Sequence, residues 1–460
     1  MKHIFTGLLI MVLLVSCKPQ TDLIIYPLPD GLVPSNDYLI EVNDQEVKVE
    51  QFTTDYDLDA LPEWFTGTPM MDRQQQVCLV SFDCNGPVTV RIEVPVKIDS
   101  ASIHPLSRGI KLQTGDEGNW LMFTLPGPDK LYIEVNDLPP LLFIANPVES
   151  EIPNAQDKNV LYFGPGVHQA GEIDLQDNQT MYIAGGAIVY GHLRGNPQNA
   201  KIIGRGILDA GYKTRLALFE NASNLTLDGV TLRNSKSWTN TLINCQNVLY
   251  HNVKVLGFGP SSDGVNPLGS RNVTIDDCFF RCTDDCIAIK APADSQIVDS
   301  IRVTNNTMIG YMFSDGVTIG YETNGPEVKN VVVNNCDIII ARGGSKVDGH
   351  SAFSIICDGP ARIHDILYEN IRVEQRVIRL FEANITDGTL YGVNPPGHID
   401  GVTLRNISWM VEKPIILKGF DKDHRVKNIT FENCTIAGKP LTKDYPLLEI
   451  NENVEGVQFK

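Results

Sequence analysis

The hydrophobic positions of the chain repeat in a nine-residue block that first reads "NLTLDGVTL" and last reads "NITFENCTI". The second position of every copy is Val, Leu or Ile, and the fourth is always apolar. The sixth position is Asn in six copies out of eight. The copies begin at residues 224, 247, 272, 300, 330, 365, 401 and 428. Such a regular pattern indicates a repeat architecture rather than an ordinary globular core.

Within each block, the alternation of apolar and polar positions predicts a strand with one buried face. Asn at the sixth position is typical of a corner, where its side chain can hydrogen-bond the backbone or the Asn of the next coil. Block starts lie 23 to 36 residues apart, which corresponds to one coil per block with loops of varying length. A leucine-rich repeat would need a helix and a leucine spacing that are missing. The pattern therefore favours an all-β fold, a parallel β-helix.

The preceding part of the chain follows a different pattern. Short alternating runs ("VTVRIEVPV", "WLMFTL", "LYIEV") are separated by Gly, Pro and Asp, which predicts a smaller β-sandwich-like domain. A polar stretch, "NPVESEIPNAQDKN", is the expected junction. We therefore expect a β-sandwich-like domain over 18–155 and a β-helix over 156–460.

The first residues, "MKHIFTGLLIMVLLVSC", have the features of an export signal over 1–17: basic residues, a short apolar run and a small residue before a cysteine. "LVSC" resembles a bacterial lipobox, which implies cleavage before Cys17 and lipid attachment to it. The alternative is an ordinary cleaved signal peptide with an incidental cysteine. We expect an exported bacterial lipoprotein in the periplasm or at the outer membrane or cell surface, held to the membrane only by its lipid.

The net charge of −18, from 38 basic and 56 acidic residues, argues against nucleic acid as a partner. It does not exclude an anionic substrate, because a groove can carry a local field of the opposite sign. Cys278, Cys336 and Cys434 occupy the seventh block position and are expected as core residues. No zinc-like Cys spacing occurs, and Cys78 and Cys84 could bridge a hairpin. A monomer without a cofactor or metal is expected.

The stretch "RCTDDCIAIKA" (281–291) places the adjacent acids Asp284 and Asp285 in a segment that otherwise reads as a buried strand. Burying a carboxylate costs several kcal/mol unless it is paired or functional. In a β-helix, residues at the same offset in successive coils stack about 4.8 Å apart. Residues at offsets of 12 to 16 from their block starts are Trp238, Asp263, Asp284, Asp285, Asp315 and Lys346. They are expected to share one groove.

Clustered carboxylates raise one another's pKa, which separates a protonated acid from an ionised base. Hydrolysis of a glycosidic bond by inversion needs such a pair with room for a water molecule. The "SDG" motifs at 262–264 and 314–316 are, taken singly, more often turns than sites. The adjacent acids therefore provide the main argument for catalysis.

At these residues the sequence resembles the polygalacturonases, glycoside hydrolase family 28. "TDDCIAIK" is similar to their Asp-Asp-Cys motif, and "SSDGVN" is similar to their Asn-Thr-Asp-Gly motif. "GRGILDAG" (204–211) resembles their early glycine-rich turn, and "NSKSWTNTLINCQNV" (234–248) resembles the segment before their active site. By this resemblance Asp284 is the general acid, and Asp263 and Asp285 activate the water.

The chain departs from that family at two motifs. "FSDGVTIG" offers Asp315 where family 28 has the His of Gly-His-Gly, and "SAFSI" (351–355) lacks the Arg and Lys of Arg-Ile-Lys. An acid at the first position is more similar to glycoside hydrolase family 49, the dextranases, which also carry an N-terminal β-sandwich. Both families imply an inverting hydrolase on a right-handed parallel β-helix. In that site Asp315 is expected to bind a sugar hydroxyl or assist the base.

Further candidates for sugar contacts are Trp238, Lys290, Tyr321, Glu322 and His350. The alternative for Lys290 is a strand-end charge in solvent, and the alternative for Trp238 is packing. The implied substrate is a polysaccharide or oligosaccharide, either a pectic or related glycan or an α-glucan such as dextran. The missing Arg-Ile-Lys argues for a neutral sugar or a differently placed acidic one.

Two other functions remain open on the sequence. A pectate-lyase-like enzyme would use the acids to hold Ca²⁺, but the Arg it needs is not apparent near Asp284. A non-catalytic glycan-binding solenoid would have no use for an adjacent carboxylate pair.

Overall fold

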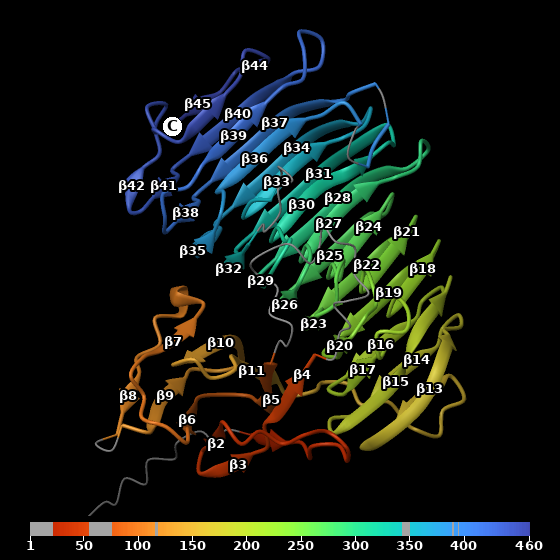
Figure 1. Cartoon of the computed structure of the whole chain (residues 1–460). Coiled ribbons are helices and arrows are strands. Elements are labelled where there is room, and N and C mark those ends of the chain that lie inside the picture. The colour runs from red at the N-terminus through yellow and green to blue at the C-terminus, as the bar shows by residue number, and fades with distance from the viewer. Residues whose placement is uncertain (1–21, 55–75, 116–117, 343–349, 389–390, 394) are drawn as a thin grey trace, which may run out of the picture.

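The computed structural model describes residues 22–54, 76–115, 118–342, 350–388, 391–393 and 395–460 (Figure 1). Cys17, with the expected signal segment, and Lys346 lie outside these residues. Apart from one short 3-10 helix, η2 (Leu106–Arg108), the described elements are strands. No helix among them is long and apolar enough to cross a membrane.

The N-terminal region consists of two mostly antiparallel sheets that share one apolar core. The first sheet contains β1 (Leu23–Ile25), β4 (Glu50–Thr53), β5 (Gln76–Cys84), β7 (Ala101–His104), β10 (Asp129–Val135) and β11 (Leu141–Pro147). The second contains β2 (Leu39–Val42), β3 (Gln45–Val47), β6 (Val88–Glu93), β8 (Gln113–Thr114) and β9 (Trp120–Leu125). Side chains that alternate inward along β6 and β9 meet those of β5 and β11, which is the packing of a β-sandwich.

The predicted pairing of Cys78 with Cys84 is wrong. Both residues lie on the single strand β5 as buried free thiols. Residues six apart on one extended strand are separated by about 20 Å, far beyond the reach of a disulfide.

From Val160 onwards the chain forms a right-handed parallel β-helix, which confirms the predicted fold class. Three stacks of parallel strands surround one long apolar core, and the buried block cysteines belong to that core. The first stack contains β12 (Val160–Phe163), β14 (Thr180–Ile183), β16 (Lys201–Gly204), β19 (Ser223–Asp228), β22 (Gln246–His251), β25 (Arg271–Asp276), β28 (Ile297–Thr304), β31 (Glu327–Asn334), β34 (Arg362–Glu369), β37 (His398–Arg405) and β40 (Val426–Glu432), with β44 (Val454–Glu455) and β45 (Gln458–Phe459) beside β40.

The other two stacks begin together at β13 (Gly166–Asp174) and β15 (Ala187–Gly195). The second stack contains β17 (Ile207–Asp209), β20 (Thr231–Arg233), β23 (Lys254–Leu256), β26 (Phe279–Cys282), β29 (Thr307–Gly310), β32 (Asp337–Ala341), β35 (Arg372–Val377), β38 (Ser408–Trp409) and β41 (Thr435–Ile436), and β42 (Lys439–Pro440) pairs antiparallel with β41. The third contains β18 (Ala217–Glu220), β21 (Asn240–Ile243), β24 (Val265–Leu268), β27 (Ile287–Ala291), β30 (Val317–Thr323), β33 (Phe353–Cys357), β36 (Phe381–Ile385), β39 (Ile415–Lys418) and β43 (Leu448–Ile450).

Asparagines at the sixth block position form a hydrogen-bonded ladder along one corner. The side-chain amide of Asn335 donates to Asn305 (2.7 Å), that of Asn406 donates to Asn370 (3.0 Å), and that of Asn433 donates to Asn406 (2.7 Å). These residues have φ values between 51° and 59°, a left-handed conformation that Asn tolerates better than other residues with a side chain. The corner role predicted for this position is therefore confirmed.

The N-terminal sandwich packs against the second stack (Figure 1). The apolar part of this contact includes Leu79, Leu142 and Ile144 of the sandwich and Leu256, Phe258, Phe279 and Ile309 of the β-helix. Buried ion pairs cross the same interface. Arg233 Nη1 lies 2.8 Å from Glu50 Oε1 of β4, and Arg205 Nε lies 3.1 Å from Asp83 Oδ2 of β5.

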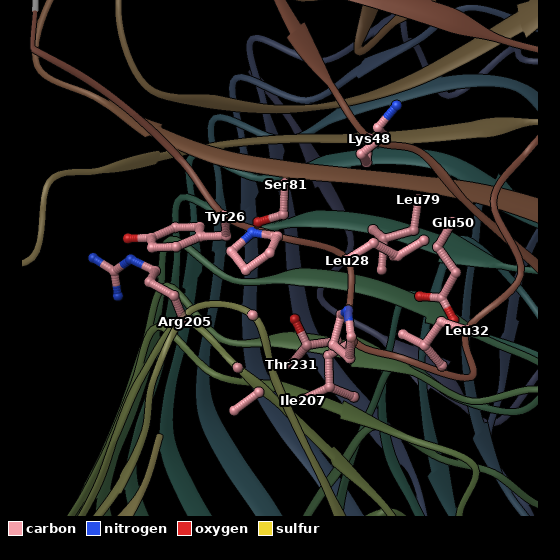
Figure 2. Close-up of a pocket in the computed structure, with 15 residues that line it drawn as sticks. Tyr26, Leu28, Leu32, Lys48, Glu50, Leu79, Ser81, Arg205, Ile207 and Thr231 are labelled. Carbon is pink, nitrogen blue, oxygen red and sulfur yellow. The ribbon is translucent and has the colours of Figure 1, made fainter. Parts of the chain in front are cut away.

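A pocket of about 520 Å³ remains between the two parts (Figure 2). Leu28, Leu32 and Leu79 line it from the sandwich side, and Ile207 and Thr231 line it from the first coils. The carboxylate of Glu50 and the guanidinium of Arg205 also reach the pocket, but each is paired across the interface, as described above. The pocket is thus a gap in the interface whose strongest charges are already neutralised.

We expect Arg233→Met to lower the free energy of unfolding by about 3–5 kcal/mol, because it leaves the buried carboxylates of Glu50 and Asp209 unpaired. Arg233 Nε is 2.7 Å from Asp209 Oδ2, and the guanidinium side chain is only 3% exposed. Urea denaturation followed by fluorescence measures the change. Lys48→Met, which breaks an exposed pair with Glu46, is the matched control and should cost about 1 kcal/mol or less. An equally small cost for Arg233→Met would contradict the prediction.

Candidate active site

The corner between the second and third stacks carries a column of polar side chains. Successive third-stack strands pair in the order Ala217, Asn240, Val265, Ile287, Val317 and Phe353. Two residues before each of these positions lie Arg215, Trp238, Asp263, Asp285, Asp315 and Ser351, which we call the corner column. Backbone bonds from Gly264 N to Asp285 O (2.8 Å) and from Cys286 N to Asp315 O (3.0 Å) hold this register.

The glycine of the first "SDG" motif is required by this close stacking. A Cβ atom on Gly264 would lie 2.3 Å from the carbonyl oxygen of Cys286 in the next coil. The motif therefore has a structural role at Gly264 and is also part of the site, because it carries Asp263 into the cleft. This resolves the choice between turn and site that the sequence left open.

A cleft of about 990 Å³ opens above the corner column. It is lined by Arg215, Ser237, Trp238, Ser261, Asp263, Asp284, Asp285, Lys290, Phe313, Tyr321, Glu322, His350 and Tyr391. All of these belong to the β-helix, so no described residue of the N-terminal sandwich lines the cleft.

Three carboxylates converge in this cleft. Asp263, Asp284 and Asp285 each place an oxygen within 4.8 Å of the others. Asp284 is partly exposed, and its Oδ1 accepts the Asp285 backbone N–H (2.9 Å). Asp285 is 4% exposed and accepts the Asp315 N–H (2.8 Å), while Asp263 is 2% exposed and accepts a hydrogen bond from Asn266 Nδ2 (2.7 Å). The most accessible of the three is therefore Asp284.

Burial raises the pKa of all three carboxyls above the usual range. The pKa of Asp263 rises to about 8, through burial first and the charge of Asp284 second, against the opposing effect of the Lys290 ammonium. The pKa of Asp285 lies well above its ordinary value because of burial and the charges of Asp284 and Asp315. The cluster as a whole therefore retains protons near neutral pH.

Lys290 is a buried member of this cluster. Its Nζ lies 3.0 Å from Glu322 Oε2, 3.7 Å from Asp263 Oδ2 and 4.3 Å from the centroid of the Trp238 ring. Burial lowers its pKa, but the charges of Asp263 and Glu322 outweigh that effect and raise the pKa. The alternative that Lys290 is a strand-end charge in solvent is wrong, because alternation along β27 directs Ile287 and Ile289 inward and Lys290 into the cleft.

Asp315 lies behind the cleft rather than in it. The residue is fully buried, and its Oδ1 accepts the Ser351 N–H (2.7 Å) while its Oδ2 accepts the Ser354 hydroxyl. His350 Nδ1 lies 3.6 Å away, and Asp315 raises the pKa of this histidine against the lowering effect of burial. The structure therefore corrects the expectation of a direct sugar contact: Asp315 supports Asp285 and His350. His350, Tyr321 and Glu322 themselves line the cleft.

Sequence reasoning missed Arg215 and Tyr391. The Arg215 guanidinium lies 4.7 Å from the Trp238 ring centroid, so with Lys290 two cations lie over that ring. Trp238 itself lines the cleft, and its predicted contact with a sugar stays a prediction. Tyr391 is 63% exposed, with its ring 5.9 Å from that of Tyr321. Arg215 precedes its third-stack strand by the same two residues as the acids of the corner column, so strand register identifies it. Tyr391 lies on a loop without a repeat pattern.

Two sets of side chains have a spacing that can hold a metal ion: Asp263 with Asp284 and Asp285, and Asp285 with Asp315 and His350. Calcium requires six or more oxygen ligands. In the first set, the ammonium of Lys290 already lies beside Asp263, and in the second, Asp315 is bonded by Ser351 and Ser354. Each set offers three ligand atoms, one from each residue, so neither by itself supplies the six or more oxygens that calcium requires.

Carboxylates that converge in an open cleft are the groups that hydrolysis of a glycosidic bond requires. The model for glycosyl hydrolases family 28 matches residues 182–445, more than half of the chain. The chain belongs to this family and is a glycosidase, which confirms the resemblance seen in the sequence.

Among relatives, exopolygalacturonase B of Aspergillus niger is 27% identical over 220 residues, covering 44% of this chain and 48% of the relative. A probable exopolygalacturonase B of Aspergillus flavus is 27% identical over 221 residues, with the same coverage. The chain thus spans about half the length of these relatives.

Among solved structures, Dex49A from Penicillium minioluteum has a TM-score of 0.67 at 14% identity, covering 95% of this chain and 96% of that one. The family 28 exopolygalacturonase of Yersinia enterocolitica has a TM-score of 0.48 at 12% identity, covering 82% and 96%. The likeness to Dex49A extends over the N-terminal sandwich as well as the β-helix, and at this identity it establishes the fold alone.

We expect Lys290→Gln to move the acidic limb of the kcat/KM profile to higher pH. The Lys290 charge lowers the pKa of Asp263, so its removal raises that pKa, and ionised Asp263 then forms only at higher pH. Below neutral pH the expected loss of kcat/KM is about tenfold or more. Lys329→Gln, which removes a lysine of the first stack, is the control. An unchanged acidic limb in Lys290→Gln would show that Lys290 does not tune the cluster.

Proposed function

We propose that the protein is an inverting glycoside hydrolase that cleaves a polysaccharide, with Asp284 as general acid and Asp263 and Asp285 as the groups that activate water. The observation that carries this proposal is the convergence of three carboxylates with raised pKa values in one cleft. Such a cluster supplies a protonated acid and an ionised base at the same pH.

In the proposed step, Asp284 gives its proton to the glycosidic oxygen as the bond to the anomeric carbon breaks. A water molecule held by Asp263 and Asp285 attacks that carbon from the opposite side and loses a proton to one of them. Asp284 suits the acid role because it is the most accessible carboxyl and burial raises its pKa. Asp263 is assigned the base role because the Lys290 ammonium lies 3.7 Å from it and opposes the rise in its pKa that burial causes.

The spacing of the carboxylates does not by itself select inversion. Inverting pairs are usually about 6.5–9.5 Å apart and retaining pairs about 5–5.5 Å. Here the nearest oxygens of the three acids lie within 4.8 Å. Inversion is proposed because three acids, rather than two, surround the site, so that two of them can hold a water while the third donates its proton.

Pectic or related glycans are the proposed substrates. The relatives named above are exopolygalacturonases, and the family match covers the whole cleft. The alternative is an α-glucan such as dextran, because the motif around Asp315 resembles that of family 49; the likeness to Dex49A is one of fold alone. Screening on pectin fragments, galactans and dextran identifies the substrate class.

We expect Asp284→Asn to lower kcat on a natural glycan by about 10²–10⁴-fold while binding is kept. An aryl glycoside with a good leaving group needs little protonation, so its hydrolysis should fall much less. Asp263→Asn and Asp285→Asn should lose rate on both substrates, because water must still be activated. If Asp284→Asn were equally inactive on both substrates and Asp285→Asn were rescued by the good leaving group, the two roles would have to be exchanged.

The first product released should have the inverted anomeric configuration. Proton NMR during the first minutes of hydrolysis, before mutarotation, measures the anomer directly. A chelator present in a parallel sample should leave the rate unchanged, because the proposed step uses no metal. A retained anomer would instead assign one carboxylate as a nucleophile, in agreement with the short oxygen–oxygen spacing.

A further inference from the structure

Arg215 occupies the first charged position of the corner column, on the N-terminal side of the acids. Its neighbour in the next coil is Trp238, and its guanidinium lies over that ring at 4.7 Å. Trp238 in turn is followed by Asp263 and then by Asp285. Arg215 is therefore three strand spacings, about 14 Å along the stack, from the coil of the general acid.

Neighbouring coils fix the backbone of Arg215. Arg194 Nη1 donates to the Arg215 carbonyl (3.0 Å), and Arg194 Nη2 donates to Thr214 Oγ1 (2.8 Å). On the other side, the Lys236 N–H donates to the Thr214 carbonyl (3.0 Å), and the Leu216 N–H donates to Ser235 Oγ (3.1 Å). The side chain therefore leaves a backbone that is held from both directions.

No carboxylate of the described residues lies within 4.0 Å of the Arg215 guanidinium. Four other arginines of the β-helix, Arg205, Arg233, Arg372 and Arg376, do form close ion pairs with acids. Lys290, the other cation of the cleft, is already neutralised by Asp263 and Glu322. Arg215 is thus a partly exposed cation that lines the cleft without an acidic partner.

Other basic residues surround this end of the cleft. Lys213 and Lys236 are exposed on the same two corner turns, and Arg194 lies directly beneath. In a chain with a net charge of −18, these residues form a local basic group. A group of positive charges favours an anionic ligand.

We propose that Arg215 binds the carboxylate of an acidic sugar unit at the N-terminal end of the cleft, so that recognition of this unit is displaced from the cleavage point. The planar guanidinium offers parallel N–H donors that match the two oxygens of a carboxylate. Its stacking on the Trp238 ring helps to hold that plane in place. This inference rests on the proposed function of the same cleft, and it assigns a residue that determines specificity.

The position of Arg215 compensates for the missing Arg-Ile-Lys motif. Without a cation at "SAFSI", the chain lacks the family's usual means of binding an acidic sugar beside the reacting bond. Arg215 provides a cation on the opposite side of the acids along the column. The acidic sugar unit that Arg215 binds is then distant from the cleaved bond. The sugar unit next to Asp284 can therefore be neutral.

The test is binding measured by titration calorimetry, which does not require cleavage. Wild-type protein, Arg215→Gln, Arg215→Lys and the control Lys213→Gln are titrated with short oligogalacturonides, with alginate oligomers, with the carboxyl-reduced form of each, with sulfated galactan oligomers and with dextran oligomers. Lys213→Gln removes one exposed charge from the same turn. Hydrolysis of each glycan is recorded separately, so a failure of catalysis is not confused with a failure of recognition.

We expect wild-type protein to bind a uronate oligomer, to lose that binding when the carboxyls are reduced, and to bind more weakly at high salt. Arg215→Gln should weaken binding about tenfold or more, Arg215→Lys by less, and Lys213→Gln hardly at all. Binding to neutral glycans only, binding to none of the panel, or an Arg215→Gln variant that binds as tightly as wild type would overturn the proposal. Binding to sulfated but not to carboxylated oligomers would overturn the assignment of a uronate.

Discussion

Hydrogen bonding between the backbones of successive coils is the constraint on which the site depends. It holds equivalent residues of neighbouring coils about 4.8 Å apart, whatever the length of the loops between them. Asp263, Asp285 and Asp315 are separated by 22 and 30 residues in the sequence, yet they occupy adjacent places in one column. A slip of one residue in this register would turn the acids toward the core and the core residues toward the cleft.

The same stacking makes the electrostatics of the site unusual, because it brings like charges together where water is scarce. The protein offsets the repulsion with specific partners. Lys290 lies between Asp263 and Glu322, while backbone N–H groups and the hydroxyl of Ser354 bind the carboxylates of Asp285 and Asp315. What remains is a raised pKa for the acids that face the cleft, which is the property that acid–base hydrolysis needs.

Charged residues also matter on both sides of this carboxylate cluster. On one side, the N-terminal sandwich is held by buried pairs such as Arg233 with Glu50, so its described residues cover the second stack, and none of them lines the cleft. On the other side, Arg215 stands without an acidic partner at the end of the cleft. Among the described residues, the interface cations Arg205 and Arg233 are therefore paired with acids, whereas Arg215 lines the cleft with no acid within 4.0 Å.

The sequence by itself determined the fold and the central acids. Block periodicity predicts the β-helix because strand alternation and Asn corners are local properties, and the adjacent acids are conspicuous because a carboxylate is expensive to bury. Only the tertiary structure decided that Asp315 lies behind the cleft, that Lys290 is buried in it, and that Arg215 and Tyr391 line it. Offsets counted from the block starts vary with loop length. They therefore predict which residues share a groove, but not which residues stack in the corner column. Which side chains meet depends on strand register and on loops without a repeat, and neither can be read from local patterns.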